Sequence, residues 1–158
     1  MMDHQSAART MTADCLCFRA RRVSRALTRM YDDALRPLGI QATQLTLLNA
    51  VAMFGEQGAT MARLAEILVM DATTLSRNLK PLETANLLFL TRLHTDRRVR
   101  IVLLTQEGER RVAAALPLWT EAHARIVAAL GEEDALQLRD RFDRATAATA
   151  RPAPPAAP

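Results

Sequence analysis

The sequence has few of the residues that a disulfide framework or a metal centre would need. Its 158 residues include only two cysteines, Cys15 and Cys17, and three histidines. Two cysteines so close together cannot form a disulfide framework, which suits a reducing compartment. The histidines, His4, His94 and His123, are not spaced as metal ligands with one another or with a cysteine. We therefore expect no metal site and no cofactor.

The sequence also lacks the motifs of common enzymes and membrane proteins. It has no glycine-rich phosphate loop and no nucleophile elbow, so we do not expect an enzyme or a catalytic residue. No uninterrupted apolar run approaches the roughly 20 residues of a membrane helix. The chain begins Met-Met-Asp-His-Gln, without a basic segment followed by an apolar one. We expect a cytoplasmic protein without a membrane partner.

The composition is that of one globular domain with unevenly distributed charge. Hydrophobic residues make up 49% of the chain and charged residues 24%, as in soluble domains of this size. The formal net charge is +4. Residues 61–100 contain seven basic and four acidic residues, whereas residues 105–151 contain seven and eight. An anionic partner is therefore expected to bind ahead of the C-terminal third.

Both ends of the chain read as tails around a single domain of residues 12–149. Residues 1–11 show no periodic pattern, and residues 150–158 repeat proline, so both are expected to be disordered. From Leu16 to Ala34 the apolar residues recur at alternating spacings of four and three. This spacing predicts a long amphipathic helix. A second helix is expected to begin near residue 43 and to stop before the glycines at 55 and 58.

Two short helices follow in the pattern of a helix-turn-helix. Thr60 and Asp71 are placed to cap helices over residues 61–68 and 72–85. The N-terminal part of the second helix would meet base edges in the major groove of DNA. Its leucines are expected to pack inward, which leaves polar side chains for bases and phosphates. The candidate contacts are Thr73, Thr74, Ser76, Arg77 and Lys80.

A change to a period of two then predicts a β-hairpin with a charged tip. The strands are expected at residues 88–93 and 99–104. Arg97 and Arg98 are expected to contact the DNA as a wing. Asp96 could hold the tip by a charge-assisted hydrogen bond, which would leave Arg97 free and give Arg98 a structural role.

Two more helices complete the chain and supply a dimer surface. Thr105 caps a helix that is expected to reach about Leu130 with a kink at Pro117, and Glu132 begins the last helix. The apolar stripes of residues 12–38 and 105–149 exceed what a small lobe of residues 59–104 needs to cover itself. This excess favours a homodimer. The alternative is a helical core within one chain.

This ordered set of elements resembles the MarR-type regulators over roughly residues 14–145. The resemblance is carried by the helix-turn-helix, Asp96-x-Arg98, the following β-run and Thr105-x-x-Gly108. It implies a mainly α-helical winged helix-turn-helix with a small β-hairpin wing, dimeric through its N- and C-terminal helices. It also implies binding to a pseudo-palindromic site in double-stranded DNA, with repression as the usual mode.

Leu16-Cys17-Phe18, near the start of the first long helix, together with residues 70–75 and 79–83, is similar to the organic-hydroperoxide-sensing subgroup of that family. There the cysteine that matches Cys17 is the sensor, and Tyr31 matches one of two tyrosines that support its thiolate; Arg21 stands at the other position. Arg21 lies four residues from Cys17, so the guanidinium and the sulfur share a helix face, which favours the thiolate. Tyr31 lies about 21 Å along the helix and could reach that sulfur only from another subunit. If both cysteines were helical, they would point about 200° apart and would not pair.

Two alternatives remain open from the sequence. A small aromatic or other apolar ligand, bound between the dimer helices and the wing lobes, could be the effector instead of a hydroperoxide, and the cysteines would then be inert. The chain could also be a helical protein-interaction module whose basic face is incidental. Steep salt dependence of duplex binding would exclude the interaction module.

Overall fold

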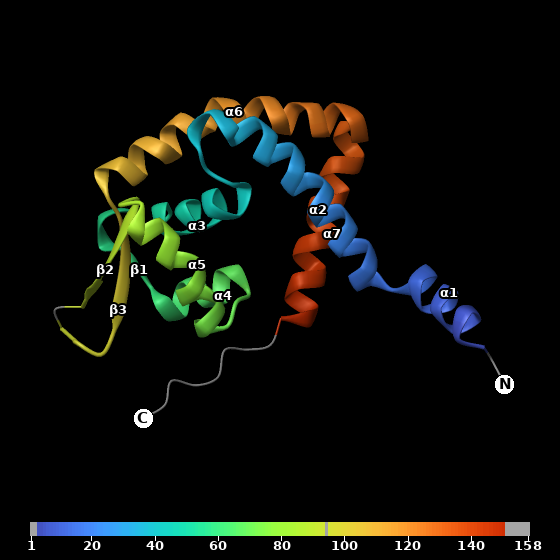
Figure 1. The fold of residues 1–158 in the computed structure, drawn as a ribbon, viewed down its shortest axis with the longest axis horizontal. Coiled ribbons are helices and arrows are strands. Elements are labelled where there is room, and N and C mark those ends of the chain that lie inside the picture. Colours follow the sequence, from blue (N-terminus) through green and yellow to red (C-terminus); the bar gives the residue numbers. More distant parts are fainter. Residues whose placement is uncertain (1–2, 94, 151–158) are drawn as a thin grey trace.

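The computed structural model describes residues 3–93 and 95–150, which form a mainly helical fold with one small sheet (Figure 1). In chain order the elements are α1 (His4–Asp14), α2 (Leu16–Leu35), the 3-10 turn η1 (Arg36–Leu38), α3 (Ala42–Ala52), the 3-10 turn η2 (Gly55–Gln57), β1 (Ala59–Thr60), α4 (Met61–Leu68), α5 (Ala72–Thr84), β2 (Leu88–Arg92), β3 (Arg100–Leu104), α6 (Gln106–Leu130) and α7 (Glu132–Thr149). The predicted winged helix-turn-helix is confirmed. Across the described ranges, no helix combines the length and the apolarity that crossing a bilayer requires.

The sheet has three antiparallel strands in the order β1-β3-β2. The hairpin register pairs Leu88 with Leu104 and Arg92 with Arg100, so the two arginines lie opposite each other where the strands meet the hairpin tip. β1 adds a third strand by pairing Ala59 with Val102. The sequence does not predict β1, because two residues are too few to show a period.

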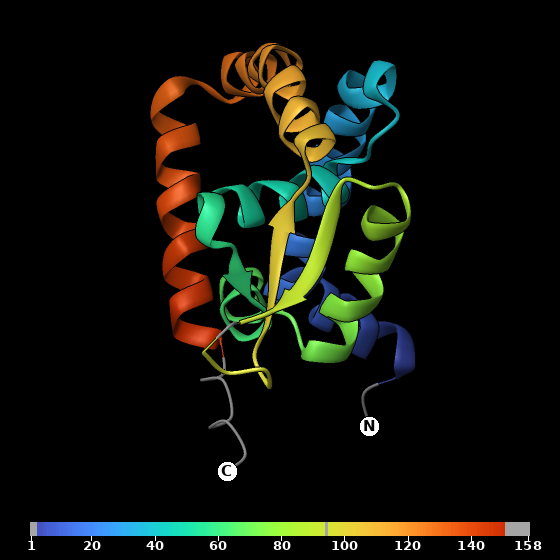
Figure 2. The same ribbon diagram turned by 90° about the vertical axis from the view of Figure 1, so that its left-hand side faces the viewer.

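The core lies between α3, α4, α5 and the sheet, and the end of α2 closes it (Figure 2). Leu75, Leu79 and Leu82 of α5 are each at most 1% exposed, which confirms that this face packs inward. Leu35 at the end of α2 is also fully buried. In contrast, α1 and α7 contribute no buried residue.

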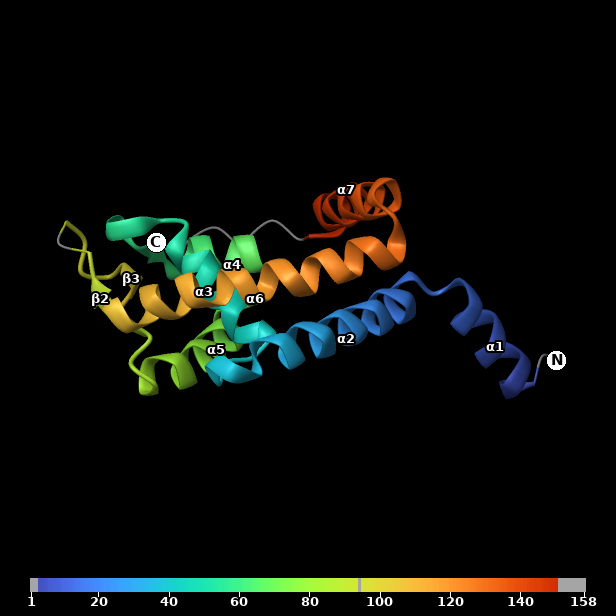
Figure 3. The same ribbon diagram turned by 90° about the horizontal axis from the view of Figure 1, so that it is seen from above.

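The N-terminal segment differs from the expected tail. Residues 4–14 form α1, capped by Asp3, whose carboxylate accepts a hydrogen bond from the amide of Ser6 at 2.7 Å. The helix extends away from the rest of the chain (Figure 3), and Met11 is 65% exposed. A helix that buries nothing carries no apolar stripe, so periodicity could not reveal it. Of the expected C-terminal tail, residues 151–158 lie outside the described part of the chain.

The long helices α2 and α6 pack side by side (Figure 3). α2 begins and ends close to the predicted bounds. α6 is one unbroken helix that includes Pro117. Its ribbon rises from the sheet and then bends to run level in Figure 1. The predicted helix bounds are thus confirmed for both elements.

The start of α5 is fixed by its N-cap. The carboxylate of Asp71 accepts hydrogen bonds from the Thr74 amide at 2.8 Å and from the Thr74 hydroxyl at 2.6 Å. These bonds, the hydroxyl first, lower the pKa of Asp71 below its ordinary value. Because the folded pKa is lowered, the cap stabilises the helix above the ordinary carboxyl pKa and loses this effect as the pH falls through the folded value.

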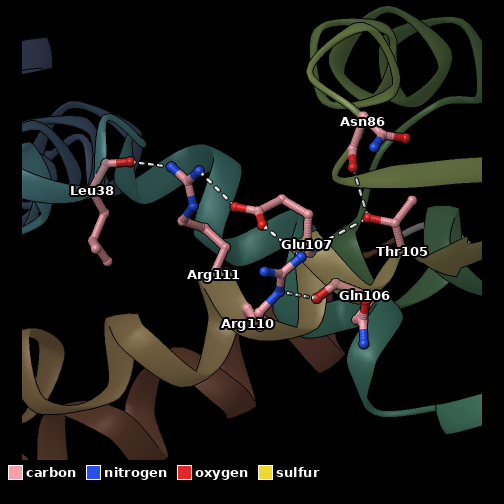
Figure 4. Close-up of polar contacts among 8 residues, drawn as sticks. Leu38, Asn86, Thr105, Gln106, Glu107, Arg110 and Arg111 are labelled. Carbon is pink, nitrogen blue, oxygen red and sulfur yellow. Dashed lines mark hydrogen bonds and ion pairs between the residues drawn. The ribbon is translucent and has the colours of Figure 1, made fainter.

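The start of α6 is joined to the loop after α5 (Figure 4). The Thr105 hydroxyl donates to the Asn86 carbonyl at 2.6 Å, and the Thr105 amide donates to the Leu87 carbonyl at 3.1 Å. Gly108 is buried here, and a Cβ at this position would lie 1.9 Å from the Leu87 oxygen. The backbones therefore approach too closely for any side chain at residue 108.

Replacement of Asp71 by alanine is expected to fray the first turn of α5. Hydrogen exchange at the Thr74 amide should become several-fold faster at neutral pH, because that amide loses its acceptor. Asp71→Asn is the control, since asparagine caps equally well and does not titrate. In the parent, protection of Thr74 should decline as the pH falls through the lowered pKa, while Asp71→Asn should not follow pH. Equal exchange in the alanine and asparagine variants would contradict the capping role.

Gly108→Ala is expected to destabilise the protein by about 3 kcal/mol, because the new methyl group meets backbone that cannot move aside. Helix propensity alone predicts the opposite sign, a gain of about 1 kcal/mol. Urea unfolding measures the difference. Glu109→Ala, at the exposed neighbouring residue, is the control and should change stability by less than about 0.5 kcal/mol. A more stable Gly108→Ala protein would refute the close approach.

Candidate nucleic-acid interface

One face of α5 presents a row of polar side chains to solvent. Thr73, Ser76 and Arg77 are exposed, and the leucines on the opposite face hold the helix against the core. Within residues 3–93 and 95–150, Arg77 makes no ion pair. Its five N–H donors are therefore available to an external acceptor.

Two other predicted contact residues of α5 have partners of their own. The Thr74 hydroxyl is held by Asp71, so its proton is committed to the helix cap and its methyl group is the part left for a contact. The Lys80 ammonium pairs with the Glu83 carboxylate at 2.8 Å. Lys80 remains 72% exposed in this pair, which can open to accept a phosphate at little cost. The sequence did not predict either partner.

The hairpin tip is ordered by Asp96 in a way that differs from the expectation. Its carboxylate accepts from the backbone amide of Arg98 at 2.9 Å, and its carbonyl accepts from the Val99 amide at 3.0 Å. The guanidinium of Arg98 takes no part in either bond. Both Arg97 and Arg98 are therefore exposed side chains on a tip that the backbone closes, and the predicted structural role of the Arg98 side chain is not observed.

Arg92 adds a contact that the sequence did not predict. From β2 its guanidinium donates a long hydrogen bond, 3.5 Å, to the carbonyl of Arg97. The wing therefore carries four arginines. Arg92 and Arg100 lie opposite each other on the two strands, and Arg97 and Arg98 lie in the tip. His94, at the start of the tip, lies outside the described residues.

The cysteines lie at the start of α2. Cys15 is the N-cap, with extended backbone angles (φ −72°, ψ 110°), and its sulfur accepts from the Phe18 amide at 3.3 Å. Cys17 is exposed in the first turn, and Arg21 is exposed one turn later. Because Cys15 is not helical, the predicted separation of 200° between the two side chains does not apply.

Tyr31 lies near the opposite end of α2 from Cys17, so the chain does not bring the two together. Its hydroxyl is 3.2 Å from Nδ1 of His123 on α6. Its ring is parallel to that of Trp119 at 6.4 Å, and Trp119 stacks on His123 at 4.7 Å. Burial raises the pKa of Tyr31. The spacing of four between Trp119 and His123 places them on one helix face, so this stacking contact could have been predicted from the sequence.

Tyr31 and His123 line a cleft of about 740 Å³ between α2, α6 and α7. Most of its walls are aliphatic or aromatic. The lining residues include Val23, Leu27, Met30, Ile126, Val127, Leu130, Leu136, Leu138 and Phe142. The cleft offers an apolar surface whose polar groups are the tyrosine hydroxyl, the imidazole and the charged side chains of Glu132, Arg139 and Asp143.

Comparisons with known proteins agree with this geometry. A model of the MarR family matches residues 38–99, and no curated protein sequence matches the chain. The transcriptional regulator MosR of M. tuberculosis, solved in complex with DNA, is 30% identical, with 86% of this chain and 99% of that chain covered and a TM-score of 0.73.

Two more distant structures share the fold. A mutant form of E. coli MarR, complexed with operator DNA, is 20% identical over 85% of this chain and 96% of that chain, with a TM-score of 0.76. PcaV of Streptomyces coelicolor, in complex with its natural ligand, is 22% identical over 89% and 96%, also with a TM-score of 0.76. Since the family model covers the helix-turn-helix and the first strand of the wing, and the MosR relative is 30% identical over 86% of this chain, the chain belongs to the MarR family of winged-helix transcriptional regulators.

Proposed function

We propose that the protein is a homodimeric, sequence-specific repressor that binds a pseudo-palindromic site in double-stranded DNA. The observation that carries the proposal is the exposed polar face of α5, held in place by a fully buried leucine face. An α-helix fits the major groove, where side chains can distinguish all four base pairs. The MosR relative was solved in complex with DNA, which supports the same partner here.

The residues of α5 divide into base contacts and phosphate contacts. Arg77 has no ion-pair partner within the described chain and can donate two parallel hydrogen bonds to a guanine. Thr73 and Ser76 can bond to base edges, and the Thr74 methyl group can touch a thymine. Lys80 would leave its ion pair with Glu83 and bind a phosphate. Such a contact fixes the register of the protein on the duplex but does not distinguish base pairs.

The wing supplies contacts that do not depend on sequence. Arg97 and Arg98 extend from a tip that Asp96 and the Arg92–Arg97 bond hold in one shape. Guanidinium groups in this position fit the minor groove or the sugar-phosphate backbone beside the α5 site. We assign residues 59–104 as the DNA-binding lobe.

The dimer is supported by apolar surface that one chain leaves uncovered. α7 buries no residue, and its Leu136 and Phe142 are 60% and 41% exposed. Leu16, at the start of α2, is 82% exposed. A second copy would cover these side chains, as symmetric dimers do. We assign residues 12–38 and 105–149 to this interface.

We further propose that oxidation of Cys17 releases the DNA. The thiolate attacks an organic hydroperoxide, the O–O bond breaks, and the products are a sulfenic acid at Cys17 and the corresponding alcohol. Cys17 is exposed in the first turn of α2, where a hydroperoxide can reach its sulfur, and Arg21 is exposed one turn later on the same helix. Tyr31 would support this sulfur from the partner subunit.

The apolar cleft favours a second candidate effector, a small aromatic ligand. Tyr31 and His123 could bond to its polar group while the aliphatic walls hold its ring. The PcaV structure, solved with its natural ligand, shows that this fold admits a small molecule. In this case a small aromatic ligand, and not a hydroperoxide, would release the DNA.

The division of roles between helix and wing predicts different losses for two arginines. Arg77→Ala should weaken binding to the preferred duplex by about 1–3 kcal/mol and leave binding to other duplexes unchanged. Arg97→Ala should weaken binding to all duplexes and reduce the salt slope by about 1. Fluorescence anisotropy at several salt concentrations, on a selected duplex and a scrambled one, measures both. Equal losses on both duplexes for both variants would contradict the division, and binding that ignores salt would favour the interaction module.

The redox proposal predicts that one cysteine is required. Cumene hydroperoxide should abolish duplex binding by the parent and by Cys15→Ser, and should leave Cys17→Ser bound. A gel shift before and after treatment, with reductant added back, measures the response. If Cys17→Ser still releases DNA on oxidation, Cys17 is not the sensor. If the parent ignores the oxidant but small aromatic compounds release its DNA, the second candidate effector is supported instead.

A further inference from the structure

Arg111 joins the start of α6 to the end of α2 (Figure 4). Its guanidinium donates to the Glu107 carboxylate at 2.9 Å and also to the carbonyl of Leu38. The side chain is 30% exposed, so the contact is partly shielded from water. Leu38 is the last residue of η1, which follows α2 directly. One side chain thus bridges two segments that are 73 residues apart in sequence.

The neighbouring Arg110 shows what is distinctive about Arg111. Arg110 pairs with the other oxygen of the same carboxylate at 3.1 Å, and its Nε donates to Gln106 in its own helix. It is 67% exposed, and both of these contacts lie within α6. Both arginines, Arg111 first, lower the pKa of Glu107. Of the two, Arg111 is the one that connects α6 to another element.

The same turn of α6 is fixed on its other side. Thr105 bonds to Asn86 and Leu87, the residues that link α5 to β2, and Gly108 touches the same loop. The first two turns of α6 therefore connect the loop after α5 with the turn after α2. Asp32 strengthens the α2 end, because its carboxylate accepts from the Ala42 amide at the start of α3 at 2.7 Å.

We propose that Arg111 is a positioning residue that sets the orientation of the DNA-binding lobe, together with the start of α6, relative to α2. In the dimer this orientation fixes the distance between the two α5 helices, and hence the spacing of half-sites that the protein accepts. The inference rests on the proposed dimeric DNA binding. Half-sites on one face of DNA lie about one helical turn, roughly 34–36 Å, apart, so a small rotation at this joint would misplace the second helix.

The test compares Arg111→Met with Arg110→Met, a matched loss of one arginine on the same turn. Duplexes carry two half-sites whose separation varies by one base pair at a time. Wild type and Arg110→Met should prefer one separation by at least about tenfold, whereas Arg111→Met should lose most of this preference. Binding to a single half-site should be unchanged in all three. Arg111→Met with the parent's preference, or Arg110→Met with the same loss, would overturn the proposal.

A second readout needs no DNA. Ser76→Cys, in a Cys15→Ser/Cys17→Ser background, places one spin label on each α5 helix of the dimer. Pulsed electron resonance should give a narrow distance distribution for wild type and Arg110→Met and a broad or shifted one for Arg111→Met. Arg111→Lys, which keeps one donor for Leu38, should fall between them and covers the case in which Arg111→Met does not fold. An Arg111→Met distance distribution equal to that of wild type would overturn the proposal, whether or not wild type binds a duplex. Failure of wild type to bind any duplex would refute the proposed function and leave the distance test of Arg111 intact.

Discussion

The contact between the Gly108 backbone and the Leu87 carbonyl is the constraint on which the arrangement of this protein depends. It fixes the loop after α5 to the first turn of α6, and the Thr105 bonds keep it in place. Because β3 runs directly into α6, the same contact also sets the position of the wing. Helix, wing and long α6 are therefore held as one unit, with Arg111 extending that unit to the end of α2.

The polar residues of the lobe separate into those that maintain its shape and those that remain available. Asp71 commits the Thr74 hydroxyl to the cap, and Asp96 closes the wing through the backbone of Arg98. Arg77 and the wing guanidinium groups are left without carboxylate partners in the described chain. Because the carboxylates of Asp71 and Asp96 bond to backbone amides and not to arginines, the arginine side chains stay available to the phosphates of DNA.

Much of the fold follows from the sequence, because apolar periodicity, caps and the change of period place α2 to α7 and the hairpin within a few residues. α1 and β1 do not, since the first buries nothing and the second is two residues long. The exposure of the candidate contact residues was predictable where one element carries them, as on α5. Partners from other elements, such as His123 beside Tyr31 or Leu38 beside Arg111, depend on tertiary packing that no local pattern encodes.

In the proposed dimer, two chains pair through their uncovered helices and present two α5 helices to one duplex. Native mass spectrometry of the protein with its preferred duplex, alongside a duplex truncated to one half-site, tests it most directly. We expect two protomers on the full duplex, with no populated complex of one protomer, and a strongly weakened complex on the half-site. A single protomer bound with equal affinity to both duplexes would contradict it.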